Sequence, residues 1–152
     1  MALPSGTLVR VANVPNSGVA VLTGTTIGTL GSNTNGTTIY TAGSQGSRVV
    51  SLTGATTDTA TINVFLYILR GGSTVVPIGL VNIPLSSGNT NAARFVVDFL
   101  NGINIPGLPV ENTGRQYIPL MPSDVLRATT LANLTASTSL FLSAHGMDYQ
   151  TI

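Results

Sequence analysis

Residues 59–84 constrain the fold more than any other stretch, because they predict a β-hairpin whose first strand is apolar on both faces. Two apolar segments flank the turn-forming residues 71–73, Gly-Gly-Ser. Side chains alternate across a strand, so the even-numbered positions of the first segment share one face. These are Ile62, Val64, Leu66 and Ile68. Polar Thr61 and Asn63 precede the odd-numbered positions, so we expect the even-numbered face to point into the core.

The odd-numbered face of the same strand carries Phe65, Tyr67 and Leu69. Apolar residues on both faces are typical of a strand that is covered on both sides. A second sheet, a loop or another subunit can supply that cover, and the sequence leaves the three options open. We therefore place Phe65, Tyr67 and Leu69 in a candidate interface as well as in the candidate core.

The chain of 152 residues is poor in charge, because Asp, Glu, Lys and Arg make up 7% of it, whereas about a quarter is typical of soluble domains. Such a surface has weak self-repulsion, so we expect it to pack against other protein. The cationic residues are all Arg and are scattered along the sequence. Nucleic-acid binding needs clustered positive charge, so we expect no nucleic-acid partner. No apolar run approaches the roughly 20 residues of a membrane helix, so we expect no membrane partner.

Short segments rich in Val, Ile and Thr recur between Gly-rich and Asn-rich turns, which predicts a single antiparallel sandwich or barrel. Besides the hairpin, the expected strands are residues 7–13, 18–22, 25–30, 37–42, 48–53, 116–120, 125–131 and 137–145. Residues 15–18 are expected to form a turn. Residues 1–6 are expected to be a flexible arm that precedes one domain, residues 7–152.

Residues 91–101 allow two interpretations. Ala92, Phe95, Val96, Phe99 and Leu100 fall at helical spacing, and Gly102 follows them as a stop. The same β-branched and aromatic residues also fit a strand. We favour one short helix in an otherwise all-β chain.

Residues 101–115 form the longest irregular segment, which includes Pro106 and Pro109. Long loops often carry function or contact partners. We therefore extend the candidate interface to this region. The residues assigned to it here are Ile105, Pro106, Leu108, Arg115 and Tyr117.

No residue pattern in the sequence indicates catalysis or a bound metal or cofactor, and we expect none of the three. Cysteine and lysine are absent and His145 is the only histidine, which leaves little for a zinc site or a phosphate-binding P-loop. Ser143, His145 and Asp148 can form a catalytic triad only if the fold brings them together, which sequence spacing does not show. We favour a structural histidine at the end of a strand.

Three short motifs resemble small virion-associated proteins encoded near the head genes of tailed phages. They are Phe65-Leu66-Tyr67 before a Gly turn, Leu126-Arg127-Ala128-Thr129, and Ala144-His145-Gly146-Met147-Asp148-Tyr149. The chain also begins with a Met-Ala-x-Pro arm of the type seen in that group. The resemblance implies a capsid cement or decoration protein with a jelly-roll or related β-sandwich fold.

The same resemblance implies an oligomer located in the virion and assembled in the host cytoplasm. Its implied partners are the major capsid protein and copies of itself, with a trimer as one option. Two other functions stay open at this point: a tail, collar or fibre-base protein of the virion, and a carbohydrate-binding sandwich module. The module is less favoured because Trp is absent and aromatic residues are few.

Overall fold

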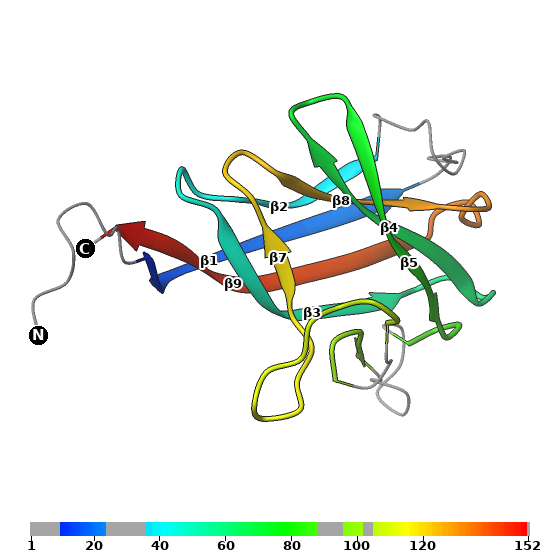
Figure 1. Cartoon of the computed structure of the whole chain (residues 1–152). Helices are drawn as coiled ribbons and strands as arrows, with labels where there is room; N and C mark the ends of the chain where they lie inside the picture. The colour runs from blue at the N-terminus through cyan, green and yellow to red at the C-terminus, as the bar shows by residue number, and fades with distance from the viewer. Residues whose placement is uncertain (1–9, 24–35, 88–95, 102–104, 152) are drawn as a thin grey trace, which may run out of the picture.

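The computed structural model describes residues 10–23, 36–87, 96–101 and 105–151, and within these ranges the chain is all-β and contains no helix (Figure 1). One sheet, here the β1 sheet, has the order β1 (Arg10–Thr23), β9 (Ser139–Thr151), β3 (Ser47–Thr56) and β6 (Val97–Asp98). The short strand β7 (Ile118–Leu120) also pairs with β3. The other sheet, here the β4 sheet, has the order β2 (Thr37–Thr41), β8 (Val125–Thr130), β4 (Ile62–Arg70) and β5 (Thr74–Ile83).

All of these strand pairings are antiparallel. β6 and β7 pair with opposite ends of β3, so together they occupy one position beside it. With that position counted once, β1-β9-β3-β6 facing β2-β8-β4-β5 is the strand order of a jelly roll built from two Greek keys. The expected antiparallel β-sandwich is therefore confirmed.

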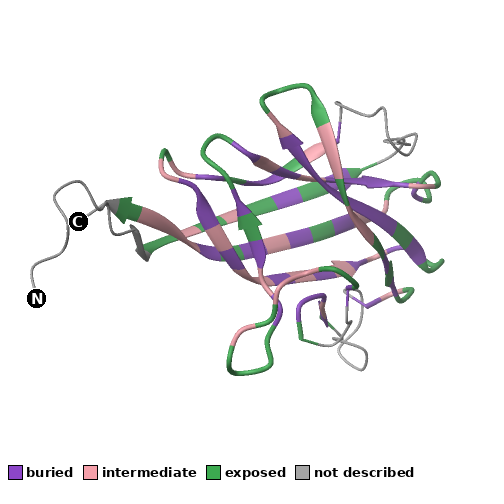
Figure 2. Ribbon diagram, viewed as in Figure 1, coloured by how far each residue is buried: buried purple, intermediate pink, exposed green. Residues whose placement is uncertain are grey.

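The core lies between the two sheets, where strands alternate buried and more exposed residues (Figure 2). Its largest fully buried side chains include Leu22, Ile39, Leu52, Leu66, Ile83, Phe99, Ile118, Leu126, Leu140 and Leu142. The even-numbered face of β4 belongs to this core, as predicted. The predicted hairpin is also confirmed, since Gly71 and Gly72 take φ values of 58° and 76° between β4 and β5. Glycine adopts this left-handed region without steric cost.

The turn predicted at residues 15–18 is wrong, because β1 continues without interruption from Arg10 to Thr23. β1 is an edge strand of its sheet, and an edge tolerates the missing N–H of Pro15. Gly18 does not mark a turn either, and the structure explains why this position needs glycine. A Cβ atom here would collide with the backbone carbonyl of Ile39 in β2. Glycine therefore permits a close approach of the two sheets, where the sequence pattern indicated a reversal.

The helix favoured for residues 91–101 is wrong for the part that the structure describes. Val97 and Asp98 pair with β3 as strand β6, and a turn follows. The Asp98 carboxylate accepts hydrogen bonds from the N–H groups of Leu100 and Asn101, at 3.0 and 3.2 Å. Aspartate commonly caps turns in this way, and that local preference outweighs the helical spacing of the apolar residues. Residues 91–95 lie outside the described ranges.

Most of the remaining strand predictions are confirmed with shifted ends. β9 is longer than expected, because it lies between β1 and β3 and pairs with both along most of its length. β7 is short and has Pro119 at its centre, as expected for an edge. The predicted arm, residues 1–6, and the predicted strand at 25–30 lie outside the described residues.

Candidate interaction surfaces

Phe65, Tyr67 and Leu69 lie on the outer face of the β4 sheet, yet they are buried within the chain. Tyr67 is 0% exposed, and its hydroxyl oxygen accepts a hydrogen bond of 2.9 Å from the Gly36 N–H. The rings of Phe65 and Tyr67 stack with centroids 5.5 Å apart. The single chain therefore covers all three side chains, and none of them offers free surface to another subunit.

The other five candidate residues belong to the segment from Ile105 to Tyr117, here the β7 loop, which precedes β7. Pro106 and Arg115 are exposed, and Leu108 and Tyr117 are half-buried. Ile105 instead packs into the core. Four of the five residues are therefore at least partly accessible on this loop. The structure adds Val110, which is 57% exposed and which no sequence pattern marks.

The β7 loop is held in a defined shape by hydrogen bonds. The buried amide of Gln116 donates to the Ile105 carbonyl at 2.7 Å and accepts from the Ile105 N–H at 2.9 Å. Near the tip, the Glu111 N–H donates to the Arg115 carbonyl at 2.8 Å, and Gly114 takes a φ of 80°. In these bonds backbone N–H and C=O groups have partners within the protein, whereas in a flexible loop such groups bind water. The loop therefore presents its exposed side chains on an ordered support.

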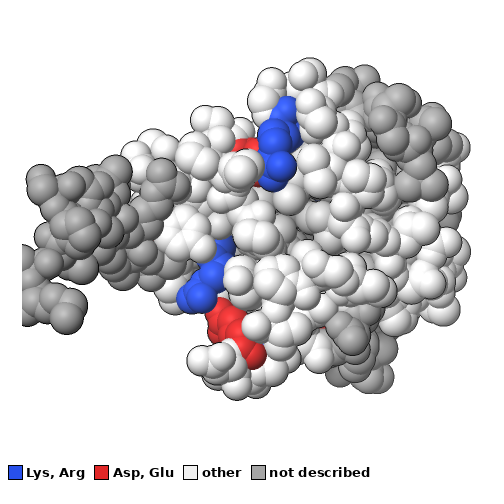
Figure 3. All heavy atoms as spheres, in the orientation of Figure 1, with Lys and Arg blue, Asp and Glu red and all other residues white. Residues whose placement is uncertain are grey.

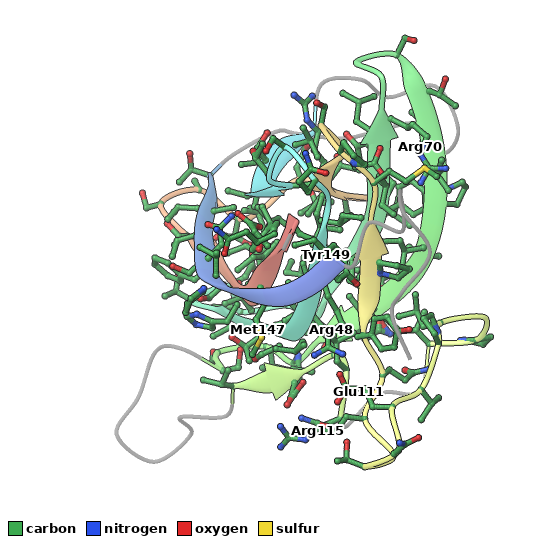
Figure 4. All side chains as sticks on the ribbon, turned by 60° about the vertical axis from the view of Figure 1, so that its left-hand side comes forward. Arg48, Arg70, Glu111, Arg115, Met147 and Tyr149 are labelled. Atoms are coloured by element: carbon green, nitrogen blue, oxygen red, sulfur yellow. The ribbon has the colours of Figure 1, made fainter. Side chains whose placement is uncertain are left out.

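An ion pair ties the tip of this loop to the β1 sheet. Arg48 of β3 places Nη1 2.9 Å from Oε1 of Glu111 (Figure 4). The Arg48 guanidinium also lies 5.6 Å from the centre of the Tyr117 ring. A partly exposed ion pair contributes up to about 1 kcal/mol, and a cation–π contact contributes a similar amount. The two interactions orient the loop more than they stabilise the fold.

Two hollows flank the β7 loop. The first, here the proline groove, has a volume of about 330 Å³ and is lined by Ile68, Val76, Pro77, Pro106, Pro109 and Pro119, among others. The second has a volume of about 350 Å³ and lies between Arg48, Val110, Glu111 and Tyr117. Both are open surface depressions with apolar and polar walls. The surface on both sides of the loop is therefore concave.

Ser143, His145 and Asp148 do not assemble into a triad. Ser143 and His145 lie on the outer face of the β1 sheet, with Ser143 Oγ 3.3 Å from His145 Nε2. Asp148 lies on the opposite side of β9, where its carboxylate accepts hydrogen bonds from Asn16, Tyr40 and Ser47. These partners come from β1, β2 and β3, so Asp148 links the two sheets at one end of the sandwich.

The Asp148 cluster shifts the acidities of two of its members. Burial alone would raise the pKa of Asp148, but hydrogen bonds from Ser47, Asn16 and Tyr40 outweigh it and hold the pKa below its ordinary value. Burial raises the pKa of Tyr40 to about 12, opposed by the Ser47 hydroxyl and assisted by the negative charge of Asp148. Asp148 therefore stays ionised and Tyr40 stays neutral at physiological pH.

Asp58 forms a second buried carboxylate clamp, in the loop between β3 and β4. It is 1% exposed and accepts hydrogen bonds from the N–H groups of Ala60 and Thr135 and from the hydroxyls of Thr135 and Thr138. Burial would raise its pKa, but these hydrogen bonds lower the pKa to about 2 from 3.8. The clamp fastens the loop after β8 to the loop before β4.

We expect the protein to lose stability as the pH falls from about 4 to about 2, because Asp58 must then take up a proton in the folded state. A depressed carboxyl pKa stabilises the fold above the unfolded-state value and ceases to do so below the folded-state value. Asp58→Asn should lower the free energy of unfolding at neutral pH by about 1–3 kcal/mol, since the amide nitrogen cannot accept hydrogen bonds. Thermal unfolding followed by circular dichroism across this pH range measures both effects. An unchanged acid dependence in Asp58→Asn would contradict the assignment.

Charged side chains form small, separate groups on the face of the molecule seen in Figure 3. In one pair, Arg70 donates to the buried carboxylate of Asp124 at 3.0 Å, and the Met121 N–H donates to the same carboxylate at 2.9 Å. In this pair, as in the pair of Arg48 with Glu111, each charge is neutralised by a partner in the same chain. The paired charges hold loops in position, and wide uncharged areas lie between the pairs on the face seen in Figure 3.

No known protein family matches the sequence, and no curated protein matches it. The described residues contain no group of three or more His, Asp and Glu side chains placed to hold a metal ion. Within the same residues, no helix has the length and apolarity needed to cross a bilayer.

Proposed function

We propose that this protein is a structural component of a tailed-phage virion, a cement or decoration protein that binds the head shell and reinforces it. The observation that carries the proposal is the ordered β7 loop, in which exposed Pro106 and Val110 each line one of two hollows and Arg115 is exposed near the tip. The jelly roll, a fold used by viral capsid domains among others, and the resemblance of the short motifs support the same function. Fold alone does not specify function, so the surface carries more weight than the architecture.

The mechanism follows from the chemistry of that surface. Exposed apolar side chains of the β7 loop would be buried against the capsid protein, and the loop would lose little conformational freedom because it is already ordered. Each contact is modest in area. A shell presents the same site many times, and oligomeric copies that engage two sites at once gain effective concentration. Reinforcement would come from bridging neighbouring capsid subunits.

The test is a comparison of phage heads with and without this protein. We expect heads that lack it to open at a lower temperature, and added purified protein to rebind and restore the original temperature. Its copy number per particle should be comparable to that of the major capsid protein. A few copies located at the tail would support the tail, collar or fibre-base alternative. Heads of equal thermal stability that do not rebind the protein would reject the proposal.

We expect Val110→Asp and Arg115→Glu each to raise the dissociation constant for phage heads by about tenfold or more. A tenfold change corresponds to about 1.4 kcal/mol of binding free energy. Both positions are exposed on the β7 loop, so the free energy of unfolding should change by less than about 0.5 kcal/mol. Leu85→Asp is the matched control, because Leu85 is 54% exposed and lies outside the loop. Co-sedimentation with heads measures the affinity. Equal weakening by Leu85→Asp would remove the β7 loop from the binding surface.

A further inference from the structure

The outer face of the β1 sheet is a second surface, distinct from the β7 loop. The strand register places three rows of side chains on this face, and each row holds one residue from β1, one from β9 and one from β3. The rows lie side by side as Val21, Phe141 and Ala55, then Val19, Ser143 and Thr53, then Ser17, His145 and Ser51. The rows run across the strands, so this face is continuous over the centre of the sheet.

Large apolar side chains are exposed on this face. Val19 is 69% exposed and Phe141 is 43% exposed, and Val96 at the β6 margin is also exposed. They surround a hollow of about 160 Å³ whose other walls include Thr53, Ala55 and Ser143. An antiparallel sheet that faces water usually carries polar residues on that side. Clustered apolar residues on a solvent-facing sheet mark an interaction site.

The part of this face that holds the three rows carries no carboxylate and no guanidinium on β1, β9 or β3, and the Arg48–Glu111 pair lies beyond it toward the Ser47 end of β3. Residues 17–23, 51–57 and 139–145 contain no Asp, Glu or Arg, and His145 is their only ionisable side chain. At the β6 margin, the Asp98 carboxylate is bound by the N–H groups of Leu100 and Asn101. A charged partner would lose its hydration here without gaining a counter-charge, which is costly. The face therefore fits an equally neutral and apolar surface.

We propose that the partner is a second copy of this chain, packed face to face through the outer surface of the β1 sheet. Each copy brings both an apolar ridge, formed by Val19, Val96 and Phe141, and the hollow beside it. When one patch packs against the same patch on another copy, the two are related by a two-fold axis. The product is a dimer with four sheet layers. A trimer needs two different patches on each copy, so this face does not produce one.

The area of the face sets the strength of the dimer. With about 3.3 Å per residue and about 4.8 Å between strands, β1, β9 and β3 cover roughly 600 Å² per copy in projection over their whole lengths, and their charge-free part covers roughly 330 Å². Two whole faces give roughly 1,200 Å² and two charge-free parts roughly 700 Å², so the interface lies at or below the lower limit for specific, stable interfaces. The dimer is therefore expected to dissociate in the micromolar range. The proposal extends the self-association suggested above and does not require a capsid.

Sedimentation velocity of the full chain from about 1 µM to about 100 µM brackets the dissociation constant expected for an interface of this size. We expect a monomer–dimer equilibrium. Val19→Lys and Phe141→Lys each bury a positive charge without a counter-charge in the dimer interface, so each should weaken the dimer by about tenfold or more. Leu80→Lys is the matched control, because Leu80 is 53% exposed on the outer face of the β4 sheet. Circular dichroism verifies that each variant is folded.

A monomer throughout this concentration range overturns the proposal, and so does a trimer. Equal weakening by Val19→Lys and Leu80→Lys overturns it too. Cross-linking gives an independent measurement, because the chain has no cysteine of its own. Facing sheets lie about 10 Å apart, so a short bismaleimide should link Ser143→Cys in dimers and should not link Leu80→Cys. Equal cross-linking of both variants contradicts the interface. These measurements use no capsid, so their failure is separate from failure of the head-binding proposal.

Discussion

Replacing Tyr67 with aspartate is expected to leave the protein unfolded at neutral pH. Tyr67 is 0% exposed and its ring packs on Phe65. Loss of a buried aromatic side chain costs about 3–5 kcal/mol, and burial of an unpaired carboxylate adds several more. The sum is comparable to the whole stability of a typical domain, about 5–15 kcal/mol. Denaturant unfolding followed by fluorescence or circular dichroism measures the loss.

Leu80→Asp is the control for Tyr67→Asp, because Leu80 lies on the neighbouring strand β5 and on the same outer face but is exposed. It should change the free energy of unfolding by less than about 1 kcal/mol. Tyr67→Phe separates the hydroxyl from the ring. It removes the acceptor for the Gly36 N–H and should cost about 1 kcal/mol. A Tyr67→Asp variant that folds with unchanged stability and fails only in assembly would return Tyr67 to the interface.

Gly18→Ala is expected to destabilise the fold by about 3 kcal/mol or more, at the upper end of the cost of overpacking. The added Cβ atom would overlap the Ile39 carbonyl oxygen and lie 3.3 Å from the Tyr40 Cα. Both neighbours are backbone atoms of β2, so no rotamer change can relieve the collision. Either β1 or β2 must move, which disturbs the packing between the two sheets.

Gly71→Ala provides the comparison for Gly18→Ala. Gly71 has a φ of 58° and no heavy atom within 4 Å of an added Cβ. The substitution should therefore cost only the left-handed backbone penalty, about 1–2 kcal/mol. Urea unfolding of both variants gives the two values. A Gly18→Ala variant as stable as Gly71→Ala would show that β1 and β2 do not approach closely at Ile39.

The sequence predicts one part of the candidate interface correctly as exposed surface and another part wrongly. Prolines and irregular composition predict a loop around Pro106 and Arg115, and loops are exposed. Strand alternation places Phe65 and Tyr67 on a second apolar face, which predicts that they belong to the same interface. Alternation does not report what covers a face, and here the chain itself covers it.

The sequence does not predict the exposed face of the β1 sheet, for a related reason. Val19 and Val21 fit a strand, and their alternation with Ala20 and Leu22 is visible in the sequence. Both alternate sets are apolar, so hydrophobic periodicity cannot decide which set faces the core. Only the position of β1 at the edge of a sheet, with β2 crossing at Gly18, points Ala20 and Leu22 inward.

The sequence by itself determined the fold class, the central hairpin and the inward face of β4, because these depend on local turn chemistry and on side-chain alternation within one strand. The tertiary structure decided which strands pair, where β1 continues through Pro15, and how Asp58 and Asp148 clamp distant loops and strands. It also separated Tyr67, which is buried, from Val19, which is exposed. The physical reason is that pairing and cover involve residues far apart in the chain, whereas periodicity records only their local order.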